Sequence, residues 1–417
     1  MTEKKKILII SDSPLVPSGV GTQTKYVIES LIDTGKYSFI CMAGAIRHNK
    51  YEPIRVDPYG DDWVIVPVDG YGNENVVREI IKTQKPDLLW FMTDPRFYVW
   101  LWKIEDEIRD KIPMMYYHVW DNYPYPMFNK KYYDSTDVIC TISKVTDDIV
   151  RTISPDVKTV HIPHAVNTEV FKVIPEEEIK QIKKTLELEN KMVFFWNNRN
   201  ARRKQSGSLI FWFKEFLDQV GHDKATLIMH TEPKDPSGQD LIAIAENLNL
   251  GGEQLRFSTS KMPPQELAKF YNIADCTINI SDAEGFGLAT LESLACATPI
   301  IVNMTGGLQE QVTDGQNVFG QAIYPSSKAI IGSQDVPYIC EDRISKQDFL
   351  NAMLSIYNMT SEERQNLGKL GQQHVFTNYS METFKQQWQD IVEETIREFG
   401  SWENRKKYNR WELLEIK

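Results

Sequence analysis

The sequence predicts an α/β protein built of two doubly wound, Rossmann-like domains that face each other across a cleft. Its 417 residues correspond to two or three domains of the usual ~150 residues. Short apolar runs typical of buried parallel strands alternate with segments of helical spacing, and this alternation restarts in the second half of the chain. Two such domains place a ligand site where the carboxyl ends of their sheets meet.

The first domain is predicted over residues 1–168. It opens with an apolar strand at residues 7–10, a glycine-containing loop, a helix over residues 22–32 and a second strand at residues 37–43. Each further strand is followed by helical spacing or by a loop rich in Pro, Asp and Asn. These further strands are expected at residues 63–68, 86–93, 113–120 and 137–143.

The second domain is predicted over residues 169–385. A charged helical stretch at residues 172–191 has the composition of a linker followed by a first helix. A strand at residues 192–198 and a helix over residues 209–220 then restart the α/β pattern. The remaining strands of this domain are expected at residues 225–231, 254–259, 275–281 and 299–303.

Composition and charge argue against several classes of protein. The 47 basic and 58 acidic residues give a net charge of −11, which argues against a protein whose main partner is nucleic acid. The five cysteines are far apart, as expected of free thiols in a reducing, cytoplasmic compartment. The apolar run near the N-terminus is too short for a signal peptide, and no run approaches the ~20 residues of a membrane span.

Residues 275–307 carry the most informative motif. Glu284 precedes a predicted helix, and Glu292 lies in its second turn. Glycines in the strand-to-helix turn leave backbone amides free to face an anion at the positive end of the helix. Two carboxylates around a phosphate site match the sugar, diphosphate and ribose of a sugar nucleotide. The amides predicted to face the donor belong to Phe286, Gly287 and Leu288.

This motif resembles the retaining glycosyltransferases of the GT-B fold with two glutamates eight residues apart, the family-4-like glycosyl transferases of group 1. The resemblance covers nearly the whole chain and implies the GT-B fold. It implies that Glu284 contacts the donor sugar near the reacting centre and that Glu292 binds the ribose. The glycine pair at residues 306–307 and the turn at residues 314–315 also match.

The resemblance extends to the segment WNNRNARRKQSG, residues 196–207, after the first strand of the second domain. Arg199 and Lys204 match the family's arginine and lysine that hold the donor diphosphate. Fixed cations there stabilise the negative charge of the departing nucleotide diphosphate without a metal. Arg202 and Arg203 exceed the pattern, and the alternatives for one of them are binding of the acceptor or exposure to water.

Further donor contacts are implied by the same resemblance. The loop PSGVG contains Gly19 and Gly21, whose backbone approaches donor and acceptor, and no third glycine supports a nicotinamide site. His118, at the end of a predicted strand, matches a histidine that contacts the donor sugar. Lys261 and Met262 are expected to contact the nucleobase, mainly through backbone atoms.

The acceptor side is less sharply indicated. Asp94 and Asp121 stand at strand ends where they could orient an acceptor hydroxyl. The aromatic run at residues 120–133, which includes Tyr123, suits either a sugar face or an aromatic corner of the core. His161 and His164 have a spacing that could suggest a metal, but Pro163 between them and the absence of a third ligand argue against it.

The C-terminal helices, residues 386–417, are expected to cross back onto the first domain, as the resemblance implies. The apolar residues of the tail, residues 399–417, are too many for a free segment and predict docking on another surface. A contact in a homodimer is the alternative for this tail.

Together these residues predict a retaining, metal-independent glycosyltransferase. It moves a hexose of the glucose or mannose class from a UDP-, GDP- or ADP-sugar to a hydroxyl acceptor on a glycan, lipid or modified DNA base, with no cofactor. A GT-B phosphorylase or sugar-nucleotide epimerase is one alternative, and a non-catalytic sugar-nucleotide-binding subunit is another.

Overall fold

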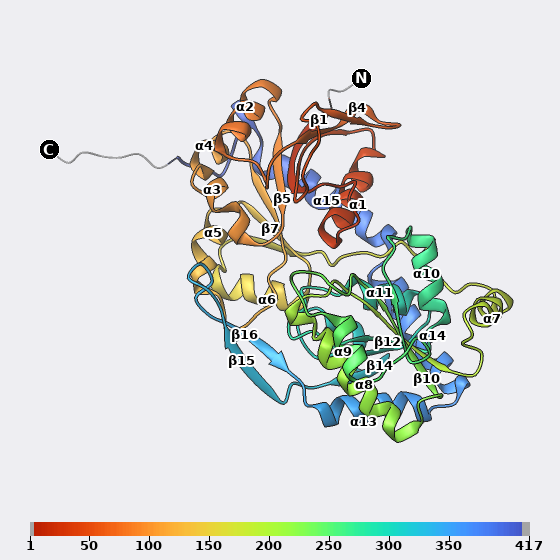
Figure 1. The fold of residues 1–417 in the computed structure, drawn as a ribbon. Helices are drawn as coiled ribbons and strands as arrows, with labels where there is room; N and C mark the ends of the chain where they lie inside the picture. The colour runs from red at the N-terminus through yellow and green to blue at the C-terminus, as the bar shows by residue number, and fades with distance from the viewer. Residues whose placement is uncertain (1–3, 411–417) are drawn as a thin grey trace.

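The computed structural model describes residues 4–410 and shows two α/β domains, one above the other in Figure 1. The first contains an eight-stranded sheet of order β3-β4-β2-β1-β5-β6-β7-β8, parallel except where β3 runs antiparallel to β4. Its strands are β1 (Lys5–Asp12), β2 (Tyr37–Gly44), β3 (Ile54–Val56), β4 (Gly60–Pro67), β5 (Leu88–Met92), β6 (Met114–His118), β7 (Val138–Thr141) and β8 (Lys158–His161). Its helices are α1 (Gly19–Ile32), α2 (Glu74–Gln84), α3 (Val99–Trp102), α4 (Glu105–Arg109), α5 (Lys130–Asp134) and α6 (Lys144–Ile153), with 3-10 turns η1 (Pro95–Tyr98) and η2 (Met127–Asn129).

The second domain contains a parallel six-stranded sheet of order β11-β10-β9-β12-β13-β14. Its strands are β9 (Met192–Asn197), β10 (Ala225–His230), β11 (Leu255–Ser258), β12 (Cys276–Asn279), β13 (Ile300–Asn303) and β14 (Gly320–Ile323). Its helices are α7 (Glu176–Thr185), α8 (Ser206–Val220), α9 (Leu241–Asn247), α10 (Pro264–Ile273), α11 (Leu288–Ala295), α12 (Leu308–Val312), α13 (Lys346–Asn358) and α14 (Ser361–Asn378), with the 3-10 turn η3 (Arg202–Lys204). Two parallel sheets covered by helices confirm the predicted α/β architecture.

Burial on both faces explains why the predicted strands are continuous apolar runs rather than alternating ones. In β1, Ile7 and Ile9 belong to one apolar cluster, whereas Leu8 and Ile10 belong to the cluster on the opposite face of the sheet. All four side chains are buried. The short strands β3, β8 and β14 were not predicted, because three or four residues of mixed polarity carry no such signal.

A two-stranded antiparallel ribbon, β15 (Ser327–Ile331) and β16 (Ile339–Arg343), was also not predicted. It is inserted between β14 and α13 of the second domain and extends toward α6 of the first domain in Figure 1. Its strands are mostly half-exposed, so they lack the apolar periodicity that marks the strands of the two large sheets.

The last long helix, α15 (Met381–Phe399), packs on the first domain. The Trp388 ring lies edge-on to Trp90 of β5 and Tyr117 of β6, with centroids 5.9 and 4.9 Å apart. Gln389 donates a hydrogen bond of 2.8 Å to the carbonyl of Ser30 on α1. The chain therefore returns to the first domain after completing the second.

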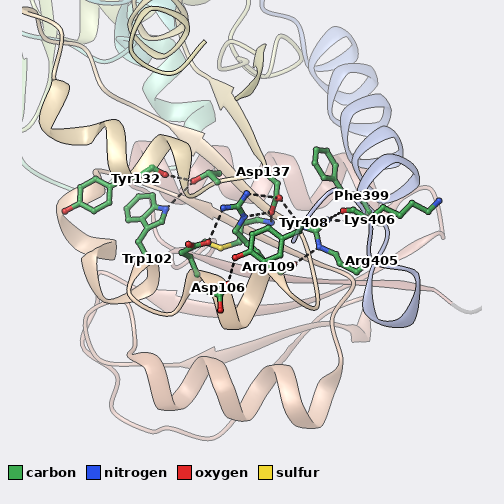
Figure 2. A network of polar contacts seen from close by, with 12 residues as sticks. Trp102, Asp106, Arg109, Tyr132, Asp137, Phe399, Arg405, Lys406 and Tyr408 are labelled. Carbon is green, nitrogen blue, oxygen red and sulfur yellow. Dashed lines mark hydrogen bonds and ion pairs between the residues drawn. The ribbon is translucent and has the colours of Figure 1, made fainter. Parts of the chain in front are cut away.

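The expectation of a second terminal helix is wrong for the described residues. The backbone of Gly400 has φ 62° and ends α15, and only a 3-10 turn, η4 (Trp402–Asn404), follows. Figure 2 shows the segment beyond it held against the first domain, with Arg405 and Asp137 2.9 Å apart and the Tyr408 hydroxyl 2.7 Å from Asp106. The predicted tail residues at 411–417 lie outside the described part of the chain.

In residues 4–410, no helix combines the length and apolar character that crossing a membrane requires.

Candidate active site

A cleft of about 1280 Å³ lies at the carboxyl ends of the central strands of both sheets. This volume exceeds the ~300–1000 Å³ of a typical small-molecule site and leaves room for two substrates. Most residues predicted from the sequence line it: Gly19, Asp94, Asp121, Arg199, Lys204, Lys261, Met262, Glu284, Phe286, Gly287, Leu288 and Glu292. Three others, Gly21, His118 and Tyr123, do not line it.

The turn from β12 to α11 brings Glu284 to the floor of the cleft. This turn packs closely on the glycine pair after β13: a Cβ at Gly306 would lie 1.9 Å from the carbonyl oxygen of Glu284, and one at Gly307 2.6 Å from the Cα of Phe286. Gly287 has φ 94° and directly precedes α11. Glycines at these positions therefore hold Glu284 and the first amides of α11 in place.

Lys204 and Glu284 form an almost fully buried ion pair in this floor. Burial opposes ionisation of Glu284, but the Lys204 ammonium and the Arg203 guanidinium outweigh it and lower its pKa to about 2. Burial lowers the pKa of Lys204 to about 8, although Glu284 favours its charged form. Arg203 also donates to the carbonyl of Ala283, and its guanidinium is 3.9 Å from Glu284.

Arg199 lies apart from this pair. Its guanidinium is 2.7 Å from the Asp235 carboxylate and donates to the Ser237 hydroxyl at 2.8 Å, and its side chain is 67% exposed. Arg203, which the sequence offered only as one of two candidates for acceptor binding, is instead the arginine beside Glu284. The backbone of η3 causes this difference, because its tight 3-10 turn directs Arg203 and Lys204, rather than Arg199, toward the β12–α11 turn.

Glu292 lies within α11, as the motif predicts. Its carboxylate accepts a hydrogen bond of 2.7 Å from the Tyr271 hydroxyl of α10. Burial raises the pKa of Glu292 to about 7. This carboxylate lines the cleft and has a second oxygen available for a hydroxyl donor.

The two glycines of the first-domain glycine loop, Gly19 and Gly21, face different surroundings. Gly19 begins α1 and faces α11, since a Cβ there would lie 3.3 Å from Leu288 Cδ1. Gly21 faces inward, where a Cβ would lie 2.6 Å from the carbonyl oxygen of Ser13. Gly21 is therefore required for packing of the loop, and it does not line the cleft. Ser18 caps α1 by accepting from the Gly21 amide at 2.9 Å.

The assignment of His118 to the donor site is not supported by its position. The ring is fully buried, its Nε2 is 2.7 Å from the Tyr133 hydroxyl, and burial lowers its pKa to about 3. The strand that carries it is buried on both faces, so a side chain at this register points into the core. His164 lines the cleft instead, with Nδ1 2.8 Å from the Tyr117 hydroxyl and its ring against Phe286.

Asp94 and Asp121 line the first-domain wall of the cleft. Asp94 caps η1 and forms a two-bond ion pair with Arg96, at 3.0 Å for each bond. Burial raises the pKa of Asp121 to about 6, with Arg203 opposing and Glu284 adding to the effect. Tyr123 points elsewhere, because its hydroxyl donates to Asp148 at 3.0 Å outside the cleft. Tyr123 thus does not line the cleft.

Lys261 and Met262, in the loop between β11 and α10, line the cleft, and their contact with a nucleobase stays a prediction. Over residues 4–410, no three His, Cys, Asp or Glu side chains are grouped as metal ligands. Sequence reasoning missed Asp12, His164, Arg96 and Glu341, which also line the cleft. They come from the end of β1, from the segment after β8, from η1 and from β16, with no shared motif, so their convergence follows only from the topology.

Residues 176–374 match the model of the family described as Glycosyl transferases group 1. Among curated relatives, the alpha-monoglucosyldiacylglycerol synthase of Streptococcus pneumoniae is 27% identical over 242 residues, which are 57% of this chain and 51% of that protein. The matches to the first curated relatives span between 12% and 51% of their lengths.

The fold is similar to those of solved structures over almost the whole chain. Sucrose-phosphate synthase from Thermosynechococcus elongatus has a TM-score of 0.75 and 16% identity, with 95% of this chain and 100% of that chain covered. HepE from Anabaena, solved in complex with UDP-glucose, has a TM-score of 0.69 and 14% identity, with 93% and 99% covered. These neighbours confirm the predicted two-domain fold.

Proposed function

We propose that this chain is a retaining glycosyltransferase of the GT-B fold and of the glycosyl transferases of group 1, the family whose model matches residues 176–374. It transfers a hexose from a nucleotide diphosphate sugar, with UDP-glucose as the first donor to test, to a hydroxyl group of an acceptor. The solved complex of HepE with UDP-glucose supports this choice of donor. The acceptor enters from the first-domain side of the cleft.

One observation supports the proposal most strongly: the buried Lys204–Glu284 pair, with Arg203 beside it, in the floor of a two-domain cleft and next to the first turn of α11. The two side chains of this ion pair are shielded from bulk solvent but line the cleft. A bound substrate can therefore replace the contact that they make with each other. Two cations and the amino end of a helix suit a diphosphate, and the carboxylate suits sugar hydroxyls.

The remaining donor contacts follow from the same arrangement. The diphosphate lies against Lys204, Arg203 and the first amides of α11, and its charge grows as the bond to the sugar breaks. The ribose hydroxyls donate to Glu292, and the base lies near Lys261 and Met262. These cations stabilise the leaving group, so the proposed reaction needs no metal ion and no cofactor.

Retention of configuration requires that the acceptor attack from the face that the nucleotide leaves. The bond between the anomeric carbon and the donor phosphate oxygen breaks, and a bond from the same carbon to the acceptor oxygen forms. The proton of the acceptor hydroxyl passes to the departing phosphate oxygen. Asp121, on the wall opposite Lys204, orients that hydroxyl as a hydrogen-bond acceptor.

The test is a panel of UDP-, GDP- and ADP-sugars scored by thermal shift, followed by assay of nucleotide diphosphate release. We expect at least one sugar nucleotide to raise the melting temperature of the protein and to be cleaved with release of the nucleoside diphosphate. This activity should be unchanged in excess EDTA. If none of them binds or is cleaved, the proposal is wrong. Loss of activity in EDTA that Mn²⁺ restores would contradict metal independence.

A further inference from the structure

The β15–β16 ribbon belongs to the second domain in sequence but packs on the first domain in space. The Asn122 side-chain amide donates to the carbonyl of Cys340 at 2.9 Å, and the Cys340 amide donates to the carbonyl of Tyr123 at 2.5 Å. The hairpin tip inserts Val336, which is buried, into the apolar cluster of the first domain. The ribbon therefore connects the two domains, and Figure 1 shows it reaching from the second domain toward α6 of the first.

The base of the ribbon is anchored beside the diphosphate-binding segment. Glu341 has a side chain 2% exposed, and both of its oxygens accept from Arg202, at 2.5 and 2.9 Å. Arg343 pairs with the same carboxylate at 2.8 Å and with Asp282 at 3.0 Å. The amide of Asp342 donates to the carbonyl of Asp282 at 2.8 Å. Arg202 is thus held next to Arg203 and Lys204 with its charge already paired.

Between these two anchors the ribbon forms a wall of the cleft. Ile331 and Ile339, which are cross-strand partners, line the cleft together with Val336 and Ser333. Trp120 of the first domain lines the same cleft. Apolar side chains beside the polar groups of Ser333 and Glu341 suit a ring that has an apolar face and hydroxyl edges.

The charges at this end of the cleft disfavour an anion. Arg96 and Arg202 are both occupied, by Asp94 and Glu341 respectively. Two further carboxylates that line the cleft, Asp12 and Asp121, have no cationic partner within ion-pair distance among the described residues. Arg343 shares Glu341 with Arg202 and also pairs with Asp282, so none of these three guanidiniums is free to bind a phosphate group on the acceptor.

We propose that the β15–β16 ribbon forms the acceptor subsite and selects an uncharged sugar or polyol over its phosphorylated counterpart. This inference rests on the function proposed above. The ribbon supplies the apolar contacts through Ile331 and Ile339, and Glu341 keeps Arg202 from attracting an acceptor phosphate. The acceptor hydroxyl then reaches the donor between Asp121 and Glu284.

The first experiment compares matched acceptor pairs with UDP-glucose as donor. Glucose, mannose and myo-inositol are each tested against their monophosphates, and acceptor-dependent UDP release is measured over hydrolysis by water. We expect each neutral compound to exceed its phosphorylated partner by at least about tenfold in kcat/KM. Preference for the phosphorylated partners, or no response to the neutral compounds while UDP-glucose is still hydrolysed, overturns the acceptor inference alone. Absence of cleavage of every sugar nucleotide overturns the proposed function instead.

The second experiment locates the selectivity in the ribbon. Ile339→Ala should raise the KM for the neutral acceptor at least about fivefold, with a smaller change in kcat. The control is Ile330→Ala, on the same ribbon but 78% exposed and outside the cleft. This control should change neither KM nor kcat. Glu341→Gln should lower the neutral-to-phosphorylated ratio at least about fivefold, because Arg202 loses its carboxylate partner. Thermal melting verifies that each variant folds. Equal effects of Ile339→Ala and Ile330→Ala, or an unchanged ratio in folded Glu341→Gln, would refute the assignment.

Discussion

Two clusters of buried charge occupy opposite roles in this molecule. The Lys204–Glu284 pair, with Arg203, lies in the floor of the cleft. The Arg405–Asp137 pair, with Arg109, lies where the C-terminal segment docks on the first domain (Figure 2). Both pairs are almost completely shielded from solvent, so burial alone does not distinguish a site from a structural contact.

The two clusters differ in where their remaining hydrogen-bonding capacity is directed. Arg405 donates to Asp137 and to the carbonyls of Arg109 and Phe399, so its guanidinium is occupied within the protein. Asp137 in turn also accepts from the amide of Met114 at 2.8 Å. Lys204 and Glu284 line a cleft, and a ligand can replace their mutual contact. Loss of a charge should therefore affect turnover in one cluster and stability in the other.

Glu284→Gln should have the largest effect. Removing the carboxylate charge weakens the contact to the donor sugar at the reacting centre, and we expect turnover to fall about a hundredfold or more with the melting temperature little changed. Initial-rate kinetics and thermal melting measure the two quantities. Glu253→Gln, a surface substitution in the same domain, is the control. Near wild-type turnover in a folded Glu284→Gln protein would show that the cleft cluster is structural.

The loss of kcat/KM on removing a cation of the cleft should be larger the closer that cation lies to Glu284. We expect Lys204→Ala to lower kcat/KM about fiftyfold and Arg203→Ala about tenfold, because both guanidinium and ammonium face the leaving diphosphate. Arg199→Ala should cost less than about fivefold while Arg199 stays paired with Asp235. A loss for Arg199→Ala as large as that for Lys204→Ala would show that Arg199 leaves Asp235 to bind the donor.

Arg405→Ala should affect the other cluster and leave the cleft unchanged. The substitution removes a cation that is 5% exposed from Asp137, and we expect the free energy of unfolding to fall by about 2 kcal/mol. The Arg109 guanidinium, 3.3 Å from Asp137, limits the loss. Denaturant unfolding and kcat/KM for the donor are the measurements, with exposed Lys407→Ala as control. A fall in activity without a fall in stability would show that the Arg405–Asp137 cluster serves activity rather than stability.

The smallest predicted effect is a pH dependence of donor binding through Glu292. Burial holds the pKa of Glu292 at about 7, above the ordinary 4.5, so the folded protein without ligand favours the protonated carboxyl. The contribution of this protonated carboxyl to folding stability is lost as the pH rises through about 7. A ribose hydroxyl donates best to the ionised carboxylate. We expect UDP-glucose affinity to rise about fivefold from pH 6 to pH 7.5, as measured by calorimetry.

Comparison with Glu292→Gln isolates that contribution from those of Asp121 and Lys204, whose pKa values are shifted to about 6 and about 8. The Glu292→Gln protein should lack the rise. An equal pH dependence in both proteins would mean that Glu292 does not titrate on binding.

The sequence alone determined the two parallel sheets and the second-domain side of the cleft. Buried parallel strands must be continuous apolar runs, and these are visible without any structure. Glu284, Glu292 and the glycines of the β12–α11 turn lie within one segment, so their spacing along the chain already defines their arrangement in space. Lys204 follows a single strand for the same reason.

Only the tertiary structure decided which residues complete the site. His118 and His164 stand in equally suggestive contexts, yet the register of β6 buries the first in the core while the second reaches the cleft. Arg203 rather than Arg199 meets Glu284 because a tight turn directs its side chain. The ribbon joins the first domain through contacts between residues more than 200 positions apart, such as Asn122 and Cys340. Local sequence carries no record of such contacts, since they depend on how the completed domains pack together.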